Sequence, residues 1–198
     1  MKLYAYQGAC SRAANILLRE AKVPVELVMV DLQSKRTEEG HDYLSINPLG
    51  FVPSLELGDG EILTENLAIL QWIGDIYGIG PIDALARARQ AEELSFLSAE
   101  LHKSFSPFFA SEPLSGEAHA SALAKLHTNI GHYERKYLTR ERDLDIASAY
   151  AFVILSWANF LSISLADHPS ASAFIASFTK HPAVAAAIAA ETPEEEHA

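Results

Sequence analysis

The sequence has only one cysteine, Cys10, among its 198 residues. A single cysteine excludes disulfides within the chain and metal sites built from several thiolates, and it is typical of proteins of the reducing cytoplasm. The histidines show no metal-ligand spacing, so we expect no metal site and no cofactor. The N-terminus also lacks the basic and then apolar pattern of a secretory signal, which again favours the cytoplasm.

Positive charge is also scarce, because 15 Lys and Arg face 26 Asp and Glu, for a net charge of −11. So acidic a chain is a poor candidate for binding nucleic acid without sequence preference, or for binding an anionic membrane. Hydrophobic residues make up 49% and charged residues 21%, an ordinary globular composition. We therefore expect neither nucleic acid nor a membrane as a partner.

Long apolar runs are missing except for one, "AYAFVILSWANFLSISLA" at residues 149–166. Its length is about the minimum for crossing a bilayer, but it contains Asn159 and several serines and has no basic flank. A helix that is apolar nearly all round is equally typical of the centre of a soluble helical domain. We favour the buried helix, because only one such segment exists and its surroundings are amphipathic.

The first 78 residues alternate between short strand-like and helix-like segments. The expected elements are, in order, residues 3–6, 11–21, 23–32, 52–57, 61–63 and 65–78. The first three form a βαβ unit with parallel strands, and "GDG" joins the next two in a hairpin. This order predicts a thioredoxin-like α/β domain over residues 1–78.

Beyond the linker "GIGPID" at residues 78–83 the strand signals stop. The expected helices are residues 84–105, 120–138, 149–166, 170–180 and 183–190. We therefore predict an all-helical domain over residues 84–198. The last eight residues, "ETPEEEHA", are expected to be a solvated acidic tail without a function.

The lone thiol lies in the turn "QGACS", between the first expected strand and the first expected helix. A cysteine that serves only for packing would more often lie inside an element. At a helix start, backbone N–H groups and the helix dipole favour a thiolate. The position of Cys10 therefore indicates chemistry, with packing as the alternative.

The stretch "NPLGFVPSLEL" places Pro53 at the opening of an expected strand. A cis peptide bond is tolerated there, and it would turn the backbone N–H and C=O of Val52 outward, toward an extended peptide. A trans proline that ends a loop is the alternative.

The stretch "LTEN" lies at the entry to a helix, where free N–H groups can bind a carboxylate. Asn66 adds a side-chain amide and Glu65 can pair with an ammonium group, so together they suit the head of an α-amino acid. The alternative is ordinary helix capping by Thr64 or Asn66. An amino-acid head, an extended backbone and a nearby sulfur together describe glutathione.

The chain resembles the glutathione S-transferases of the bacterial beta class over essentially its whole length. The resemblance rests on six stretches in order: "GACS", "LLREA", "VDLQSKRTEEGHDYLSINPLGFVPSLEL", "DGEILTEN", "ELHKSFSPFF" and "LDIASAYAFVILSW". It implies a glutathione site made of Cys10 facing the sulfur, Lys35 at the glycine carboxylate, Val52 before Pro53 at the cysteinyl backbone, Glu65 and Asn66 at the γ-glutamyl head, and His102 and Lys103 beside the sulfur. Ser11 is the alternative partner for the sulfur.

The sequence departs from the family pattern at three places. Asn66 stands where Ser or Gly is common, and Ser95 stands where the family often has an Asn that contributes to the site. Asp145 and Ser148 exchange the usual residues of a capping box, so we expect Ser148 to reach back less well.

Aromatic residues of the helical part have two interpretations. Phe105, Phe108 and Phe109 recur at helical spacing and are core residues first, and His102 by itself could be a packing residue. One of these three phenylalanines, with Trp157 or Phe160, could also form the wall of an apolar pocket for a second substrate, and we expect Phe108 with Trp157 there.

The sequence therefore predicts an enzyme that transfers glutathione to small apolar electrophiles, with thiol–disulfide exchange through Cys10 as a further possibility. The alternative is a non-catalytic ligand carrier or docking protein on the same fold. We also expect a homodimer, with Leu49 and Phe51 at its interface.

Overall fold

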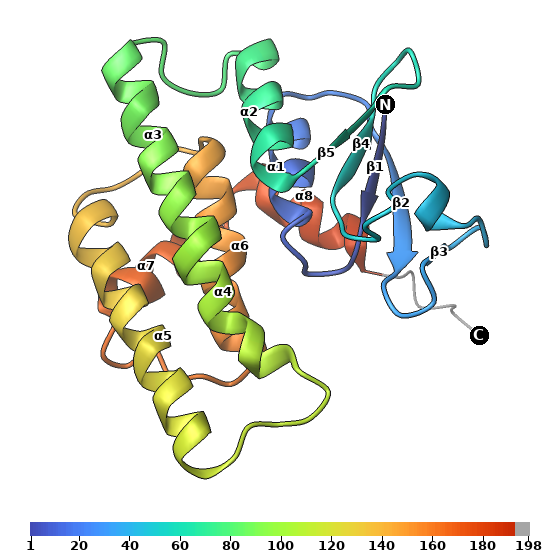
Figure 1. Ribbon diagram of the computed structural model, residues 1–198. Helices are drawn as coiled ribbons and strands as arrows, with labels where there is room; N and C mark the ends of the chain where they lie inside the picture. Colours follow the sequence, from blue (N-terminus) through green and yellow to red (C-terminus); the bar gives the residue numbers. More distant parts are fainter. Residues whose placement is uncertain (193–198) are drawn as a thin grey trace. The chain divides into compact units, whose positions relative to one another are not determined.

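The computed structural model describes residues 1–192 of the chain. It divides into two compact units, one made of Met1–Gly80 with the described residues from Lys180 onward, and one made of Pro81–Thr179 (Figure 1). The described residues from Lys180 onward thus belong to the first unit. The sequence analysis had assigned all of residues 84–198 to the helical domain.

The first unit is built on a five-stranded mixed sheet. Its strands are β1 (Lys2–Ala5), β2 (Glu26–Asp31), β3 (Arg36–Thr37), β4 (Ser54–Glu56) and β5 (Ile62–Thr64). The spatial order is β3-β2-β1-β4-β5, and only β1 and β2 run parallel, with Leu3 opposite Leu27. The expected βαβ unit, the hairpin and the thioredoxin-like arrangement are confirmed. Strand β3 was not predicted, because two polar residues carry no hydrophobic alternation.

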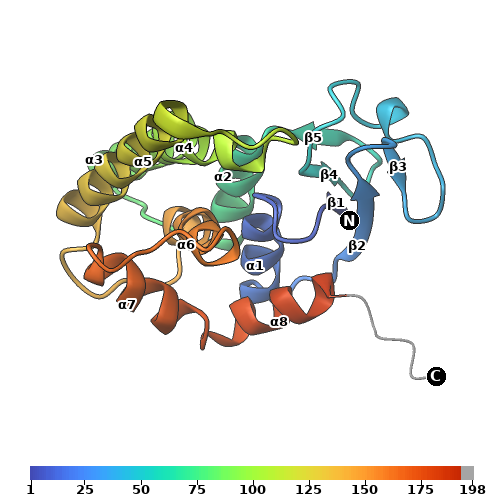
Figure 2. The same cartoon turned by 90° about the horizontal axis from the view of Figure 1, so that it is seen from below.

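Side chains that alternate along β1 cover both faces of this sheet. Leu3 and Ala5 are fully buried on the face of α1 (Arg12–Glu20) and α2 (Asn66–Tyr77) (Figure 2). Tyr4 points the other way and packs with Val28, Val30 and Tyr43. Tyr43 lies on the short 3₁₀ helix Tyr43–Ser45, which the sequence analysis did not predict.

The last helix, α8 (Pro182–Glu191), packs on α1 within the first unit. Its buried residues include Val184, Ala187 and the carboxylate-bearing Glu191. The prediction that residues 191–198 form a solvated tail is wrong for Glu191, which is 2% exposed. Thr192 is exposed, as expected, and residues 193–198 lie outside the described residues.

The second unit consists of helices. They are α3 (Ala84–Phe96), the π-helical turn Leu97–Leu101, α4 (His102–Phe105), the 3₁₀ turn Ser106–Phe109, α5 (Gly116–Tyr137), α6 (Ile146–Phe160) and α7 (Pro169–Phe178). The one long helix expected over residues 84–105 is thus interrupted by a π-helical turn just before His102. Such turns are frequent at functional sites.

Helix α6 is the centre of this unit, and the other helices enclose it (Figure 2). Twelve of its 15 residues are buried, which confirms a buried core helix, but the helix ends at Phe160 rather than at residue 166. Within residues 1–192, no single helix is long and apolar enough to cross a membrane, and only the bent pair α7 and α8 passes on length and composition alone.

A capping box begins α6. The Asp145 side chain accepts from the Ser148 N–H at 2.7 Å, and the Ser148 hydroxyl accepts from the Asp145 N–H at 2.7 Å. The prediction that Ser148 would reach back less well is wrong, because its short side chain spans the turn at full hydrogen-bond strength.

Candidate functional site

The loop between β1 and α1 holds Cys10 at the start of the helix. The Ala13 N–H donates to the Cys10 carbonyl at 3.1 Å, so the first helical turn begins at the cysteine. The Cys10 Sγ atom lies 3.5 Å from the Val52 carbonyl oxygen, to which the thiol donates. The lone thiol therefore contacts the segment that the sequence analysis singled out for binding an extended backbone.

Burial, with a smaller contribution from the nearby Glu65 carboxylate, raises the pKa of the Cys10 thiol to about 11. The backbone N–H groups of Cys10 and Ser11 act in the opposite direction but are outweighed. The expectation that the helix start makes Cys10 a thiolate is therefore not met in the free protein. At neutral pH Cys10 is a protonated hydrogen-bond donor.

This protonation state predicts slow alkylation of Cys10. With a pKa of about 11, we expect iodoacetamide to react at pH 7 about 10-fold more slowly than with free cysteine, since the thiolate fraction falls faster than its nucleophilicity rises. The rate should still be climbing above pH 9, and Glu65→Gln should increase it. Mass spectrometry against time measures this, and a rate that is already level at pH 7 would contradict it.

Ser11 does not present its hydroxyl to a ligand. The side chain is fully buried, accepts from the Tyr6 N–H at 3.2 Å and lies 3.4 Å from the Tyr6 carbonyl. Its geometry therefore argues against Ser11 as the alternative partner for a sulfur. The hydroxyl holds the loop that carries Cys10 instead.

The segment before β4 presents the backbone of Val52. The Val52–Pro53 peptide bond is cis, as the sequence analysis considered for this position. Within residues 1–192 the Val52 N–H makes no hydrogen bond, so it is free to pair with an extended ligand. The Val52 carbonyl already accepts from the Cys10 thiol.

Three side chains that the sequence analysis missed hold this segment in place. The Phe51 carbonyl accepts from the Tyr43 hydroxyl and from the Asn47 side-chain amide, each at 2.8 Å. The buried Ser54 hydroxyl lies 2.7 Å from the Tyr43 hydroxyl. The signal in the sequence was weak, because an Asn before a proline is read first as a turn.

Glu65 and Asn66 lie at the start of α2 in an unusual backbone conformation. Glu65 has φ 68° and ψ 118°, a strained region for a non-glycine residue, and its side chain does not cap the helix. Strain of this kind clusters at ligand-binding positions. The alternative of ordinary capping by Thr64 or Asn66 is not met, because the N-cap residue is Glu65 and its exposed side chain makes no cap hydrogen bond.

Both polar atoms of the Asn66 side-chain amide are buried and lack a hydrogen-bond partner within residues 1–192. An unpaired buried amide costs about 1–3 kcal/mol, so such groups call for an explanation. The first N–H groups of α2 also have no partner within the helix. A bound carboxylate would accept from the amide and from these N–H groups at once.

Lys35 extends the same site beyond Val52. Its ammonium donates to the Gly50 carbonyl at 2.9 Å and lies 5.9 Å from the centre of the Phe51 ring. Gly50 has φ +66°, and a Cβ there would come within 3.0 Å of the Lys35 side chain. The glycine therefore makes room for the lysine, which places a positive charge two residues from Val52.

A buried carboxylate from the far end of the chain holds the Cys10 loop. Glu191 accepts from the Gly8 N–H at 3.1 Å, from Arg12 Nε at 2.7 Å and from Asn15 Nδ2 at 3.2 Å. Its side chain is completely buried. The sequence analysis missed it, because these contacts span more than 170 positions of the chain.

His102 lies in the helical unit, where its Nδ1 atom is 2.7 Å from the Tyr150 hydroxyl and its ring packs on Trp157. Burial lowers the pKa of His102 to about 4, and the adjacent Lys103 ammonium contributes. The imidazole is therefore neutral at physiological pH and acts as a hydrogen-bonding group.

This pKa has a consequence for stability. Because the pKa of His102 falls from 6.5 to about 4 on folding, the unfolded chain binds more protons in that interval, and stability decreases as the pH falls. We expect His102 to contribute about 2 kcal/mol to the loss of stability between pH 7 and pH 5. Urea unfolding at both pH values should show a smaller loss for His102→Gln, whereas the exposed His132→Gln should keep the wild-type difference. Equal losses in all three proteins would contradict the prediction.

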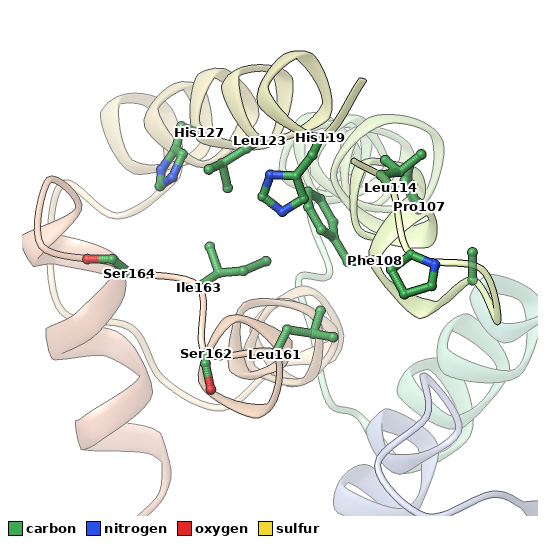
Figure 3. Close-up of a pocket in the computed structure, with 12 residues that line it drawn as sticks. Pro107, Phe108, Leu114, His119, Leu123, His127, Leu161, Ser162, Ile163 and Ser164 are labelled. Carbon is green, nitrogen blue, oxygen red and sulfur yellow. The ribbon is translucent and has the colours of Figure 1, made fainter. Parts of the chain in front are cut away.

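Phe108 and Trp157 do not share a cavity in the structure. Phe108 lines a cavity of the helical unit, and Trp157 is buried against His102, Phe105 and Phe109 (Figure 3). The aromatic rings that are exposed here are Phe109 and Phe160, which stack with centroids 6.3 Å apart. Trp157 does not line the cavity that Phe108 lines, and of the pairs considered for an apolar wall, Phe109 with Phe160 is the exposed one.

The chain is similar to proteins of one known family. Residues 8–76 match the family model described as glutathione S-transferase, N-terminal domain. The glutathione S-transferase GstA of Escherichia coli O157:H7 is 36% identical, over 96% of this chain and 98% of the relative.

Two solved structures of bacterial relatives are also similar. The beta-class glutathione S-transferase of Sphingomonas chungbukensis is 38% identical with a TM-score of 0.89, over 96% of this chain and 98% of that one. A sphingomonad glutathione S-transferase in complex with glutathione is 39% identical with a TM-score of 0.89 and the same coverage.

Proposed function

The chain belongs to the glutathione S-transferase family, and we propose that it binds glutathione in its first unit and transfers it to small apolar electrophiles. The observation that carries the proposal is the buried, unpartnered amide of Asn66 beside the strained Glu65. In this proposal the α-carboxylate of the γ-glutamyl group accepts from Asn66 and the first N–H groups of α2. Glu65 pairs with the α-ammonium group.

The remaining parts of glutathione follow along the same unit. The cysteinyl residue pairs with the free Val52 N–H, and the glycine carboxylate binds the Lys35 ammonium. The support for this order is that the Lys35 ammonium lies at the Gly50 carbonyl, in the same segment as Val52. The ligand's sulfur then lies at Cys10.

Cys10 acts in this proposal as a donor to the glutathione thiolate, toward which its single S–H proton turns from the Val52 carbonyl. A protonated thiol with a pKa of about 11 keeps its proton at pH 7 and can stabilise a neighbouring S⁻. Lowering the pKa of glutathione by two units requires about 2.7 kcal/mol of preferential stabilisation. One charge-assisted hydrogen bond and the start of α1 can supply this amount. The raised pKa does not favour disulfide exchange through Cys10, so the proposed activity is conjugation alone.

The helical unit supplies the residues that the family resemblance associates with the sulfur and the electrophile. We propose that the neutral His102 and Lys103 assist activation. The exposed aromatic pair Phe109 and Phe160 would offer an apolar surface to the electrophile. We also propose a homodimer, because Leu49 and Phe51 are 64% and 66% exposed in the first unit. A cytoplasmic location stays a prediction from the single cysteine.

Purified protein should bind immobilised glutathione and conjugate it to a chlorinated dinitrobenzene well above the spontaneous rate. Glu65→Gln should raise the KM for glutathione, with retained far-UV circular dichroism as the control for folding. Tight binding of apolar ligands without turnover would favour the carrier on the same fold instead. Sedimentation at micromolar concentration tests the homodimer, and a monomer would contradict it.

A further inference from the structure

The helical unit contains a cavity of about 420 Å³ that the proposed function does not use (Figure 3). It lies between α5, the turn after α4 and the segment that follows α6. Most of its walls are apolar, and the large apolar side chains that line it include Phe108, Leu123, Leu161 and Ile163. None of the described residues that line it is Asp or Glu, so an anion could enter without facing a carboxylate.

Two histidines of α5 point into this cavity (Figure 3). His119 and His127 are eight residues apart, with Leu123 midway, so all three share one face of the helix at about 12 Å from end to end. This separation is too large for both imidazoles to bind one metal ion. It suits one elongated organic molecule with a polar group at one end.

His127 differs from His119 because it ends a chain of buried polar groups. Its Nδ1 atom lies 2.9 Å from Nε2 of His168, and Nδ1 of His168 lies 2.8 Å from a carboxylate oxygen of Glu134. The other Glu134 oxygen accepts from the Ala171 N–H at 2.9 Å. The side chains of His168 and Glu134 are only 8% and 12% exposed.

The direction of these hydrogen bonds follows from the carboxylate, which can only accept. Nδ1 of His168 therefore carries a proton and donates to Glu134. If both imidazoles are neutral, Nδ1 of His127 donates to His168 and its Nε2 atom is a bare acceptor. One added proton turns Nε2 of His127 into a donor. Within residues 1–192 this Nε2 atom makes no hydrogen bond.

The charged and titratable groups around His127 are few. They are His168 at the start of α7, Glu134 on α5, His119 at the other end of the cavity, and Arg135, which lies beside Gly131 together with the His168 ring. The wall that follows α6 contributes only Leu161, Ser162, Ile163 and Ser164. The groups that can take up a proton at this cavity are therefore the Glu134–His168–His127 chain and His119.

We propose that this cavity is a second ligand site, which binds a small apolar carboxylate such as an arylalkanoate. The carboxylate accepts from Nε2 of His127, and the apolar body runs along Leu123 toward Phe108. Binding takes up one proton from solvent, because the ligand's negative charge stabilises the protonated histidine pair. Affinity therefore decreases as the pH rises.

Calorimetric titration with phenylbutyrate tests the proposal, with the protein kept saturated with S-hexylglutathione so that the glutathione site is occupied. Repeating the titration in two buffers of different ionisation enthalpy measures the proton uptake. We expect binding with uptake of up to one proton per ligand and at least about 10-fold weaker binding of the neutral phenylbutyramide, since a hydrogen bond to a charged group is lost. Binding that disappears on saturation with S-hexylglutathione would overturn the proposal.

Four variants locate the ligand. His127→Gln should weaken phenylbutyrate binding at least about 10-fold, and Leu123→Trp should abolish it by filling the cavity. The exposed His132→Gln, on the same helix, should bind as the wild type does. All three should conjugate glutathione at the wild-type rate, which controls for folding.

The fourth variant, Glu134→Gln, separates a proton-coupled site from a merely structural contact. If the glutamine oxygen accepts from the Ala171 N–H, its NH₂ group donates to Nδ1 of His168. His168 then carries its proton on Nε2 and donates to Nδ1 of His127. The proton of the neutral His127 ring is therefore on Nε2, where it faces the ligand. Phenylbutyrate should then bind without proton uptake. Unchanged proton uptake in this variant, or unchanged affinity in His127→Gln, would overturn the proposal.

Discussion

Replacing Asn66 with alanine is expected to weaken glutathione binding by at least about 10-fold without destabilising the free protein. Both polar atoms of the Asn66 amide are buried and unpaired within residues 1–192. Removing an unpaired buried amide relieves its desolvation cost, so the free energy of unfolding should stay level or rise by about 1 kcal/mol. In the complex the same amide would donate to a carboxylate, and that charge-assisted bond is lost.

Stability and affinity should therefore change in different directions in this variant. Urea unfolding measures the first quantity and calorimetric titration with glutathione measures the second. Asn129→Ala is a suitable control, because its amide already donates to the Glu100 carbonyl in the helical unit. A loss of stability with unchanged affinity for glutathione would show that Asn66 is a structural residue.

Replacing Glu191 with alanine is expected to destabilise the protein by about 3 kcal/mol, since it leaves Arg12, whose side chain is only 16% exposed, without its partner. The buried Glu191 carboxylate binds Arg12, Asn15 and the Gly8 N–H. The Gly8 N–H lies two residues before Cys10, so glutathione affinity should fall as well. Glu191→Gln should lose less stability, because the amide oxygen can still accept a hydrogen bond from some of these three donors.

Glu20→Ala provides the matched control for this prediction. Glu20 also faces the segment that leads into α8, but its contact with His181 is 4.0 Å long and its side chain is 39% exposed. Exposed pairs of this kind contribute well under about 1 kcal/mol. If urea unfolding gives Glu191→Ala and Glu20→Ala the same midpoint, then the buried contact has no special role.

The sequence predicted the elements that have strong periodicity or strong turn signals. The βαβ unit, the hairpin with its "GDG" turn and the buried helix α6 are confirmed. The features it did not predict depend on tertiary contacts, which local patterns do not encode. Examples are the two-residue strand β3, the π-helical turn before His102 and the return of α8 to the first unit.

The same distinction holds for the site. Residue type and position were enough to select Glu65 and Asn66, because a helix start has known chemistry. They were not enough for Cys10, whose pKa is decided by burial rather than by the helix start. Tyr43 and Glu191 could not be found, since their role is to hold segments that are distant in the sequence.

The proposed binding of glutathione depends most on Glu65, which recognises the α-ammonium group at the start of α2. Its most direct test is a double-mutant cycle by calorimetric titration, with glutathione and its analogue lacking the α-amino group, against the wild type and Glu65→Gln. We predict that the wild type binds the analogue about 30-fold more weakly than glutathione, whereas the variant binds the two nearly equally, which is a coupling of about 2 kcal/mol. An equal loss of affinity in both proteins would contradict the claim.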